Sequence, residues 1–326
     1  MSDSFRPMTE VALVRSVLRK WYDIRSQRCL LWHKGMNRIF ETDSHVVKLH
    51  SWGSWEKAAL KAREELLAKI AAADCLALLP IRNSYGSYYT EHISVSGRTV
   101  FSVYNRVACD VQPRSFSDVS SVVRSFRRVP KGAHPAAIDS GLVLQAYRQH
   151  LSGTQTPASP TAERMIEGIS PTLDRSENRC LLHGDLHLYN FGIETSGQWI
   201  AIDCDTFGFG HYLYDVATLF WSFLRRRFDY DVSRLAREIA DQEETISVLG
   251  AEFGEALSGC DRHLTLWNLI IARHIWWLGL RAGLAVERGR ELIFTAEHKR
   301  EVVLLEQLEQ AALQSTAEGD LAQEIL

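Results

Sequence analysis

The sequence predicts an α+β protein in which a small N-terminal antiparallel sheet with one helix precedes a larger, mainly helical C-terminal part. Short β-prone runs separated by turn residues are concentrated in the first hundred residues. Longer helical patterns follow Tyr104, and strand character returns only briefly between Cys180 and Asp203. A chain of 326 residues is long enough for two domains, or for one domain with two lobes.

Five short runs in the N-terminal part alternate with turn chemistry and predict strands. They are Cys29–Trp32, Arg38–Glu41, His45–Leu49, Tyr88–Ile93 and Thr99–Val103. The first three form a meander, and a Ser-Val-Ser-Gly turn joins the last two. We therefore assign residues 1–103 to an N-terminal lobe, 104–108 to a hinge and 109–326 to a C-terminal lobe.

One helix is predicted between these strands. Ser54 is suited to cap it, and the helical pattern runs through Ile70. Leu60, Leu67 and Ala71 share one face at helical spacing. The helix can therefore pack on the small sheet through an apolar face.

The composition is that of a folded globular protein. Hydrophobic residues make up 46% and charged residues 24%, which excludes intrinsic disorder, collagen and coiled coil. Lysine and arginine number 37 against 40 for aspartate and glutamate, a net charge of −3. Because the chain has no overall basic field, we expect no nucleic-acid partner.

Cysteine spacing and hydropathy indicate a cellular location. None of the six cysteines forms a Cys-x-x-Cys pair, which excludes zinc ribbons and thioredoxin-like motifs and fits reduced thiols. The N-terminus has no apolar stretch typical of a signal peptide. The longest uninterrupted apolar runs fall short of the roughly 20 residues that a spanning helix needs. We expect a cytoplasmic protein without membrane contact.

The stretch HGDLHLYN, residues 183–190, carries the chemical signal together with Asp203. Phosphoryl transfer needs a carboxylate that orients and deprotonates the acceptor hydroxyl, and side-chain oxygens that hold Mg²⁺ against the phosphates. Asp185 and Asn190 stand five apart, as the Asp and the metal-binding Asn do in the protein-kinase catalytic loop. Asp203 ends the predicted strand Trp199–Ile202 and can supply a second metal ligand.

At these residues the sequence resembles the kinase-fold small-molecule phosphotransferases, which include aminoglycoside phosphotransferases, choline kinases and type II homoserine kinases. Their pattern HGDxHxxN, then a strand ending in IDxD, then a glycine-containing turn and a helix entered by Asp-[LV]-Ala is matched in order by HGDLHLYN, IDCD and TFGFGHYLYDVA. The resemblance spans residues 28–225 and implies a bilobal protein-kinase-like fold. It also implies that ATP and Mg²⁺ are the cofactors.

The resemblance assigns roles residue by residue. Asp185 is implied as the catalytic base or hydroxyl-positioning group, and Asn190 and Asp203 as Mg²⁺ ligands. The implied structural residues are His183 and His187, which shape the loop, and Asp215, which braces it through the backbone. Asp205 has two interpretations: it supports the metal ligands or it caps the loop.

A nucleotide also needs a lysine on a strand and a helix glutamate that holds it. Lys48 lies in a predicted strand, and Glu64 shares the apolar helix face with Leu60 and Leu67, so it needs a buried partner. We predict that Lys48 is that partner, whereas Glu65 is a solvated helix charge.

Two further segments are expected to contact the nucleotide. The turn Gly35-Met-Asn37 resembles the G-x-N-x-x-[YF] loop of the family, with Gly35 and Asn37 in the matching positions. The hinge segment contains Tyr104 and Arg106, and we expect its backbone to meet the adenine edge.

The acceptor is less well defined. Residues 229–261 hold nine acidic residues against two arginines, a field that would attract a cationic acceptor such as an aminoglycoside; a solvated helix face is the simpler interpretation. We expect Trp267, Trp276 and Trp277 to belong to the core rather than to a substrate platform.

These patterns predict an ATP- and Mg²⁺-dependent kinase acting on a small-molecule hydroxyl, in an aminoglycoside-like antibiotic, an amino alcohol or a homoserine-like metabolite. The alternatives are a Ser/Thr protein kinase of the stress-response type, which shares the pattern IDxDxxxxG, and a nucleotide-binding regulator without turnover. A metal hydrolase is a further alternative, with His183, Asp185 and His187 as ligands.

Overall fold

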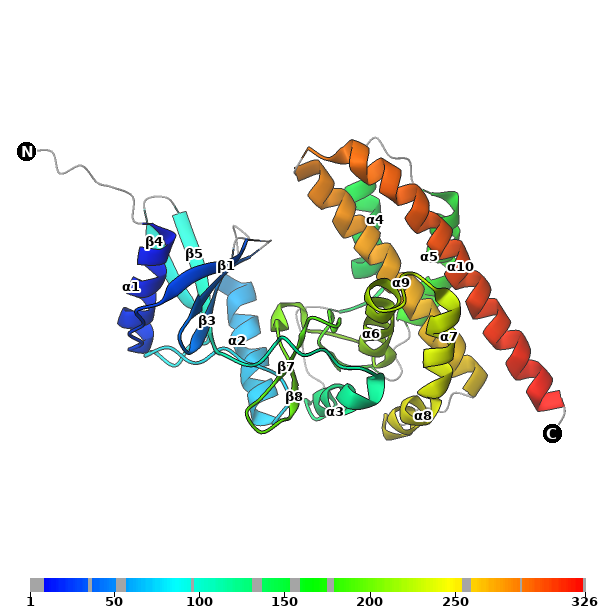
Figure 1. Ribbon diagram of the computed structural model, residues 1–326, viewed down its shortest axis with the longest axis horizontal. Coiled ribbons are helices and arrows are strands. Elements are labelled where there is room, and N and C mark those ends of the chain that lie inside the picture. Colours follow the sequence, from blue (N-terminus) through cyan, green and yellow to red (C-terminus); the bar gives the residue numbers. More distant parts are fainter. Residues whose placement is uncertain are drawn as a thin grey trace, which may run out of the picture.

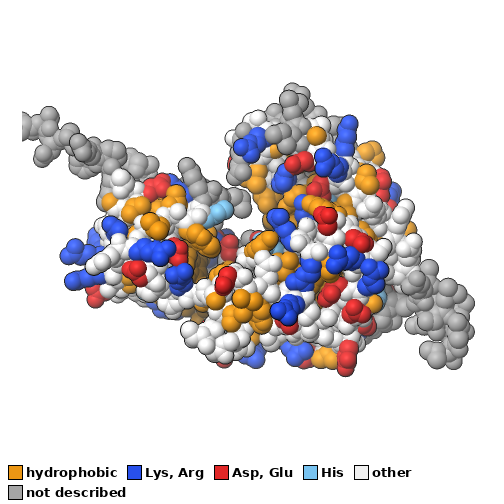
Figure 2. Space-filling model, viewed as in Figure 1, with side chains coloured by type: hydrophobic (Ala, Val, Ile, Leu, Met, Phe, Trp, Pro, Cys, Tyr) orange, Lys and Arg blue, Asp and Glu red, His pale blue; other side chains and the backbone are white. Residues whose placement is uncertain are grey.

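The computed structural model shows two parts that lie side by side (Figure 1). The smaller is a sheet with the helices α1 and α2, and the larger is mainly helical. Figure 2 shows a hollow between them. The structure describes residues 9–324 except 35–36, 51–56, 95–96, 131–136, 153–158, 175–178, 254–258 and 288.

The N-terminal sheet has five antiparallel strands in the order β1-β2-β3-β5-β4. They are β1 (Cys29–Lys34), β2 (Arg38–Thr42), β3 (His45–His50), β4 (Thr90–Ser94) and β5 (Gly97–Asn105). All five predicted strands are present, and the antiparallel arrangement is confirmed. β5 continues through Tyr104, so this residue of the expected hinge belongs to the sheet.

The side chains of β3 alternate between the two faces of the sheet. Val47 and Leu49 pack with helix α1 (Glu10–Tyr22) in one hydrophobic cluster. Lys48 and His50 therefore face the other side, toward the C-terminal part. Helix α1 was not predicted from the sequence, although Thr9 caps it by accepting a hydrogen bond from the Ala12 amide.

Helix α2 (Lys57–Ala72) links the sheet to the C-terminal part. The predicted cap Ser54 lies outside the described residues, and the helix continues two residues beyond Ile70. Its buried residues Leu60 and Leu67 belong to the large hydrophobic cluster that extends through the C-terminal lobe. The predicted apolar face is thus buried between the two parts at Leu60 and Leu67, whereas Ala71, expected on the same face, is exposed.

The C-terminal part combines two small two-stranded antiparallel sheets with helices. β6 (Arg179–Leu182) pairs with β9 (Gly208–His211), and β7 (Phe191–Ile193) pairs with β8 (Trp199–Ala201). The helices are α3 (Phe116–Phe126), α4 (Ser140–Ser152), α5 (Pro160–Asp174), α6 (Leu213–Arg226), α7 (Val232–Asp241), α8 (Glu243–Glu252), α9 (Gly259–Glu287) and α10 (Glu291–Glu324). The two small sheets carry the loops that contain Asp185 and Asp203, and the helices support them.

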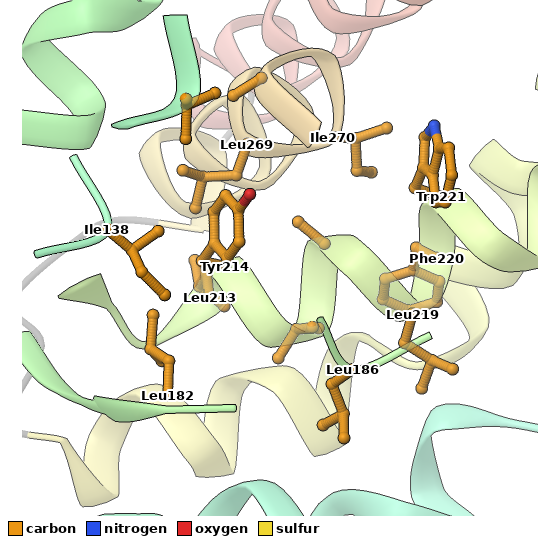
Figure 3. Close-up of a cluster of buried hydrophobic side chains, with 14 of the residues drawn as sticks. Ile138, Leu182, Leu186, Leu213, Tyr214, Leu219, Phe220, Trp221, Leu269 and Ile270 are labelled. Atoms are coloured by element: carbon orange, nitrogen blue, oxygen red, sulfur yellow. The ribbon is translucent and has the colours of Figure 1, made fainter. Parts of the chain in front are cut away.

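Helices α6 and α9 form the centre of this support. Figure 3 shows Tyr214 of α6 beside Leu269 of α9, and Trp221 of α6 on the side of Ile270. Helix α9 also contacts α4, α5 and α10. The 27-residue segment Asp261–Glu287 within α9 is long and apolar enough to cross a membrane by length and composition, but 56% of its most apolar window is buried inside the protein. Its apolar surface therefore packs in the core.

Candidate active site

The loop after β6 is held by a buried aspartate. Asp215, at the start of α6, accepts hydrogen bonds from the amides of His183 at 2.7 Å and Gly184 at 2.9 Å. Burial raises the pKa of Asp215 to about 7. Gly184 has φ +81°, and a Cβ there would lie 2.3 Å from the Thr206 carbonyl oxygen. Only glycine fits between the two loops, and Asp215 braces the loop as the sequence predicted.

Both ring nitrogens of His183 are used inside the protein. Nδ1 accepts from the Asp185 amide at 3.3 Å, and Nε2 lies 2.8 Å from the Ile202 carbonyl oxygen, to which it must donate. Burial lowers the pKa of His183, which agrees with a neutral ring. Since no lone pair is left for a metal, the metal-hydrolase alternative is wrong. Among the described residues no group of three His, Cys, Asp or Glu side chains could hold a metal ion.

Asn190 and Asp203 are positioned on either side of the β7–β8 hairpin. Asn190 Nδ2 donates to the Asp185 carbonyl oxygen at 2.7 Å, and the Asn190 carbonyl accepts from the Ile202 amide at 2.9 Å. Asn190 Oδ1 accepts no hydrogen bond from any residue within the described ranges. Asp203 has left-handed backbone angles, φ 62° and ψ 54°, a strained conformation that places its side chain in a cavity.

These donors fit Mg²⁺, because carboxylate and amide oxygens are the ligands that this hard cation takes from proteins. The two carboxylates already bind a positive charge, because the Lys48 ammonium group is bonded to both Asp203 and Asp205. Asp205 therefore contributes a second carboxylate beside Asp203, which favours a role in supporting the metal ligands. An ion pair with Lys48 is not a contact that a simple loop cap would make.

The ion pairs around Lys48 shift the pKa values of their members. Burial alone would lower the pKa of Lys48, but Asp205 and Asp203 raise it above its ordinary value. Burial alone would raise the pKa of Asp205, but Lys48 and His50 lower it. Burial, together with Lys48 and Arg63, lowers the pKa of His50 to about 4 although Asp205 opposes this. Lys48 and Asp205 are thus both charged at neutral pH.

The predicted contact between Lys48 and Glu64 is not made in this structure. Glu64 accepts hydrogen bonds from the amides of Tyr88 at 3.1 Å and Tyr89 at 3.0 Å, and also bonds to the Ser87 hydroxyl. The reason is that the segment entering β4 brings backbone donors to the inner face of α2, and these satisfy the carboxylate. Glu64 fastens β4 to α2 rather than orienting the lysine.

The remaining nucleotide-contact predictions have mixed outcomes. Gly35 lies outside the described residues. Asn37 Nδ2 is 3.4 Å from Asp205 Oδ2, so this residue reaches the site. Tyr104 is buried against Ser102, and Arg106 bonds to Glu41 on β2 through its side chain and to Ser44 through its amide. Those two residues do not line the cavity described below, and their contact with adenine stays a prediction.

Asp185 has two neighbours that fix its position. Arg273, at the middle of α9, donates to Asp185 Oδ1. His187 Nε2 is 3.8 Å from Asp185 Oδ2, while His187 Nδ1 accepts from the Tyr189 amide. Burial lowers the pKa of His187, so the ring is neutral. Arg273 was not predicted, yet a lone arginine in the apolar run from Leu269 to Leu280 requires a buried partner and could have signalled it.

A cavity of about 430 Å³ is lined by Asp185, Asp203, Asp205 and Arg273, but not by Lys48 or Asn190. The rest of its lining comes from Asn37 just before β2, from β3 and α2, from the loops carrying Asp185 and Asp203, and from helices α6 and α9. No described residue of the acidic segment 229–261 lines it, so that segment is a solvated face with respect to this cavity. Trp267 is buried in the core as expected, whereas Trp276 and Trp277 are half-buried: they pack against the core and also line the cavity.

Comparison with known proteins places this geometry in context. The sequence matches the phosphotransferase enzyme family (APH) over residues 37–258. Among curated proteins no significant match was found. A microcompartment-associated aminopropanol kinase is 15% identical, covers 94% of this chain and 100% of its own, and has a TM-score of 0.68.

Two other solved structures have the same arrangement. A choline/ethanolamine kinase family protein from Mesorhizobium loti is 12% identical, with 94% of this chain and 98% of that chain covered and a TM-score of 0.59. A spectinomycin phosphotransferase in complex with ADP and spectinomycin is 12% identical, with 91% and 98% covered and a TM-score of 0.59. The predicted bilobal, kinase-like α+β fold is confirmed.

Proposed function

The chain belongs to the phosphotransferase enzyme family, and from this premise we propose that it transfers the γ-phosphoryl group of ATP to a hydroxyl group of a small molecule, with Mg²⁺ as cofactor. The observation that carries the proposal is the convergence of Asp185, Asp203, Asp205 and Arg273 on one cavity. A carboxylate for the acceptor and a cation-binding pair for the phosphates therefore face the same space.

Asp185 orients the acceptor. Its carboxylate accepts the hydrogen bond of the incoming hydroxyl and takes the proton as the oxygen bonds to the γ-phosphorus, while the bond to the β,γ-bridging oxygen breaks and ADP leaves. Arg273 and the Asn190 side chain fix the carboxylate and the backbone of this residue. Asp185 therefore acts chiefly by positioning, which contributes because a misplaced hydroxyl reacts far more slowly.

Lys48, Asn190 and Asp203 serve the nucleotide side. Asn190 and Asp203 would hold Mg²⁺, which neutralises charge on the phosphates when bound. Lys48 would contact the α- and β-phosphates, and its buried position on β3 fixes its direction. An ADP complex in the similar spectinomycin phosphotransferase supports an adenine nucleotide as the donor.

The cavity favours a small molecule over a protein as the acceptor. Its volume of about 430 Å³ lies in the range of small-molecule sites. The location we propose is the cytoplasm, where ATP is available. A protein kinase of the stress-response type and a non-catalytic regulator are outcomes that the experiment below separates.

The test is turnover by an Asp185→Asn variant. The amide keeps the shape of the side chain but lacks its charge and basicity, so kcat should fall by ~10²- to 10⁴-fold with little change in ATP affinity. The control is Asp241→Asn, an exposed aspartate on α7 that should leave both unchanged. The assay follows ADP release with a panel of hydroxyl compounds and a generic protein substrate.

Each outcome of this assay has a definite meaning. Unchanged kcat in Asp185→Asn would contradict the role of that residue. Phosphorylation of the protein substrate alone would make the chain a protein kinase. ATP binding without transfer to any acceptor would make it a regulator.

A further inference from the structure

The wall of the cavity opposite the sheet is built by α6 and α9. Eight side chains of these two helices line it: Trp221, Ser222, Arg225, Arg226, Arg273, Trp276, Trp277 and Leu280. Three are arginines and three are tryptophans, and none of them belongs to the residues assigned above to ATP or Mg²⁺. This wall lies beside Asp185, so it faces the part of the acceptor near the reacting hydroxyl.

The tryptophan rings on this wall already carry cations. The Arg225 guanidinium carbon lies 3.6 Å from the ring centroid of Trp277, and that of Arg273 lies 4.2 Å from the centroid of Trp276. Both guanidinium groups also lie over Trp221, at 5.3 Å and 5.1 Å. Aromatic faces attract ammonium groups through their quadrupole. Here the protein's own arginines occupy those positions, which disfavours an acceptor with a positive charge.

The three arginines differ in their partners. Arg225 bonds through both terminal nitrogens to Glu301 on α10, at 2.8 Å and 3.3 Å, so its charge is balanced. Arg226 is exposed, lies 5.7 Å from the ring of Tyr189, and is paired with no carboxylate among the residues that the structure describes. The unbalanced positive charge at this wall is therefore that of Arg226.

Arg273 supplies a second, independent observation. Its side chain is 3% exposed, and one terminal nitrogen is bonded to Asp185. Its Nε and Nη1 atoms are buried and have no hydrogen-bond partner within the described part of the chain. Unpaired buried donors are costly, and a planar guanidinium is suited to bind carboxylate or phosphate oxygens through two donors. An anionic group beside Asp185 would lie next to this guanidinium at the cavity lining, where its one carboxylate partner among the described residues is Asp185.

We propose that the acceptor carries an anionic group, a carboxylate or a phosphate, close to the hydroxyl that is phosphorylated, and that Arg226 and Arg273 bind this group. The inference rests on the proposed function and narrows its substrate to hydroxy acids or phosphorylated alcohols. It argues against aminoglycosides and amino alcohols, because these would place ammonium groups against the arginines of this wall.

The test uses four three-carbon compounds that share hydroxyl groups and differ in charge. They are glycerate, glycerol 1-phosphate, glycerol and 3-amino-1,2-propanediol. Binding is measured by tryptophan fluorescence and calorimetry with Mg·ADP present, so that the nucleotide site is filled. We expect at least one of the two anions to bind at least tenfold more tightly than glycerol, and the amine to bind most weakly. Which anion binds better distinguishes a carboxylate site from a phosphate site.

Two variants locate the binding. Arg226→Gln should weaken binding of the preferred anion about tenfold and leave glycerol unchanged, since a neutral ligand gains nothing from the charge. Arg237→Gln, an exposed arginine on α7 outside the cavity, is the matched control and should change neither. Arg273→Lys keeps the positive charge beside Asp185 but removes the planar fork, and it should also weaken anion binding.

The inference is overturned if the amine binds as tightly as the anions, if no compound is preferred, or if anions bind only when Mg·ADP is absent. Its failure differs from failure of the proposed function. A protein that binds glycerate but not Mg·ATP would refute the kinase, whereas a protein that binds Mg·ATP and phosphorylates the amine best would refute only the anionic acceptor.

Discussion

Replacing Lys48 with methionine should destabilise the fold and reveal which carboxylate depends on this lysine. Lys48 is 5% exposed and is bonded to Asp205, whose side chain is 18% exposed. Asp203 is 45% exposed, so water screens its share of the interaction. Methionine keeps the apolar stem and removes the charge. Since removal of one partner leaves the other buried and uncompensated, we expect a loss of about 3–5 kcal/mol at pH 7.

The loss of stability caused by Lys48→Met should become smaller at low pH, because it depends on the charge of Asp205. In the native protein its pKa is lowered, so its contribution to stability is present above the unfolded pKa and disappears as the pH falls through the folded value. In Lys48→Met burial raises that pKa instead, and the protonated form is then the stable one. The difference in unfolding free energy between the two proteins should therefore narrow from pH 7 toward pH 3.

The assay is equilibrium urea unfolding followed by circular dichroism and tryptophan fluorescence. Lys61→Met is the matched control: this lysine is on α2, its side chain is 79% exposed, and we expect a change below about 0.5 kcal/mol. A double-mutant cycle with Asp205→Asn should show coupling of at least about 1 kcal/mol, while a cycle with Glu64→Gln should be additive. Strong coupling to Glu64 and none to Asp205 would refute the reasoning.

Three further predictions concern other parts of the molecule. Asp203→Ala should abolish Mg²⁺-dependent ATP binding in a folded protein, and unchanged Mg·ATP affinity by calorimetry would disprove its assignment as a metal ligand. Glu64→Ala should lower the unfolding free energy by about 1–3 kcal/mol, because the amides of Tyr88 and Tyr89 lose their acceptor, with ATP affinity preserved; lost affinity at full stability would contradict it. Burial lowers the pKa of His274 to about 3, so the neutral ring is compatible with the fold above pH 6.5, and stability is lost as the pH falls and the unfolded chain takes up a proton. His274→Gln should therefore reduce the loss of stability between pH 6.5 and pH 4.5 by about 2 kcal/mol in urea titrations, and an unchanged pH profile would count against it.

Much of the fold could be predicted because its signals are local. The alternation of side chains in the strand His45–His50 places Val47 on the apolar face and Lys48 on the other, independently of the rest of the fold. The order HGDLHLYN, a short strand and Asp203 specifies a loop and a hairpin whose ends meet. The cap of helix α1 at Thr9 and its apolar spacing are also local, so the signal for this helix too lies in its own sequence.

The partners of buried charges could not be predicted in the same way. Helical spacing shows that Glu64 faces inward and needs donors, but the donors are backbone amides of a segment more than twenty residues away. Lys48 likewise needs carboxylates, and a turn 155 residues later provides Asp203. Local sequence determines that such a group must be paired, and the packing of the lobes decides with what.

The cavity wall built by α6 and α9 shows most clearly what local sequence determines and what packing decides. The sequence by itself determined the candidate residues for phosphoryl transfer, since their order and spacing within one loop and one strand are a property of the chain. It could not determine the charge around the acceptor, because the acidic segment 229–261 and the wall arginines are close in sequence but face different surroundings. Only the packing of α9 against α6 brings Arg273 beside Asp185 and leaves Arg226 without a carboxylate among the described residues.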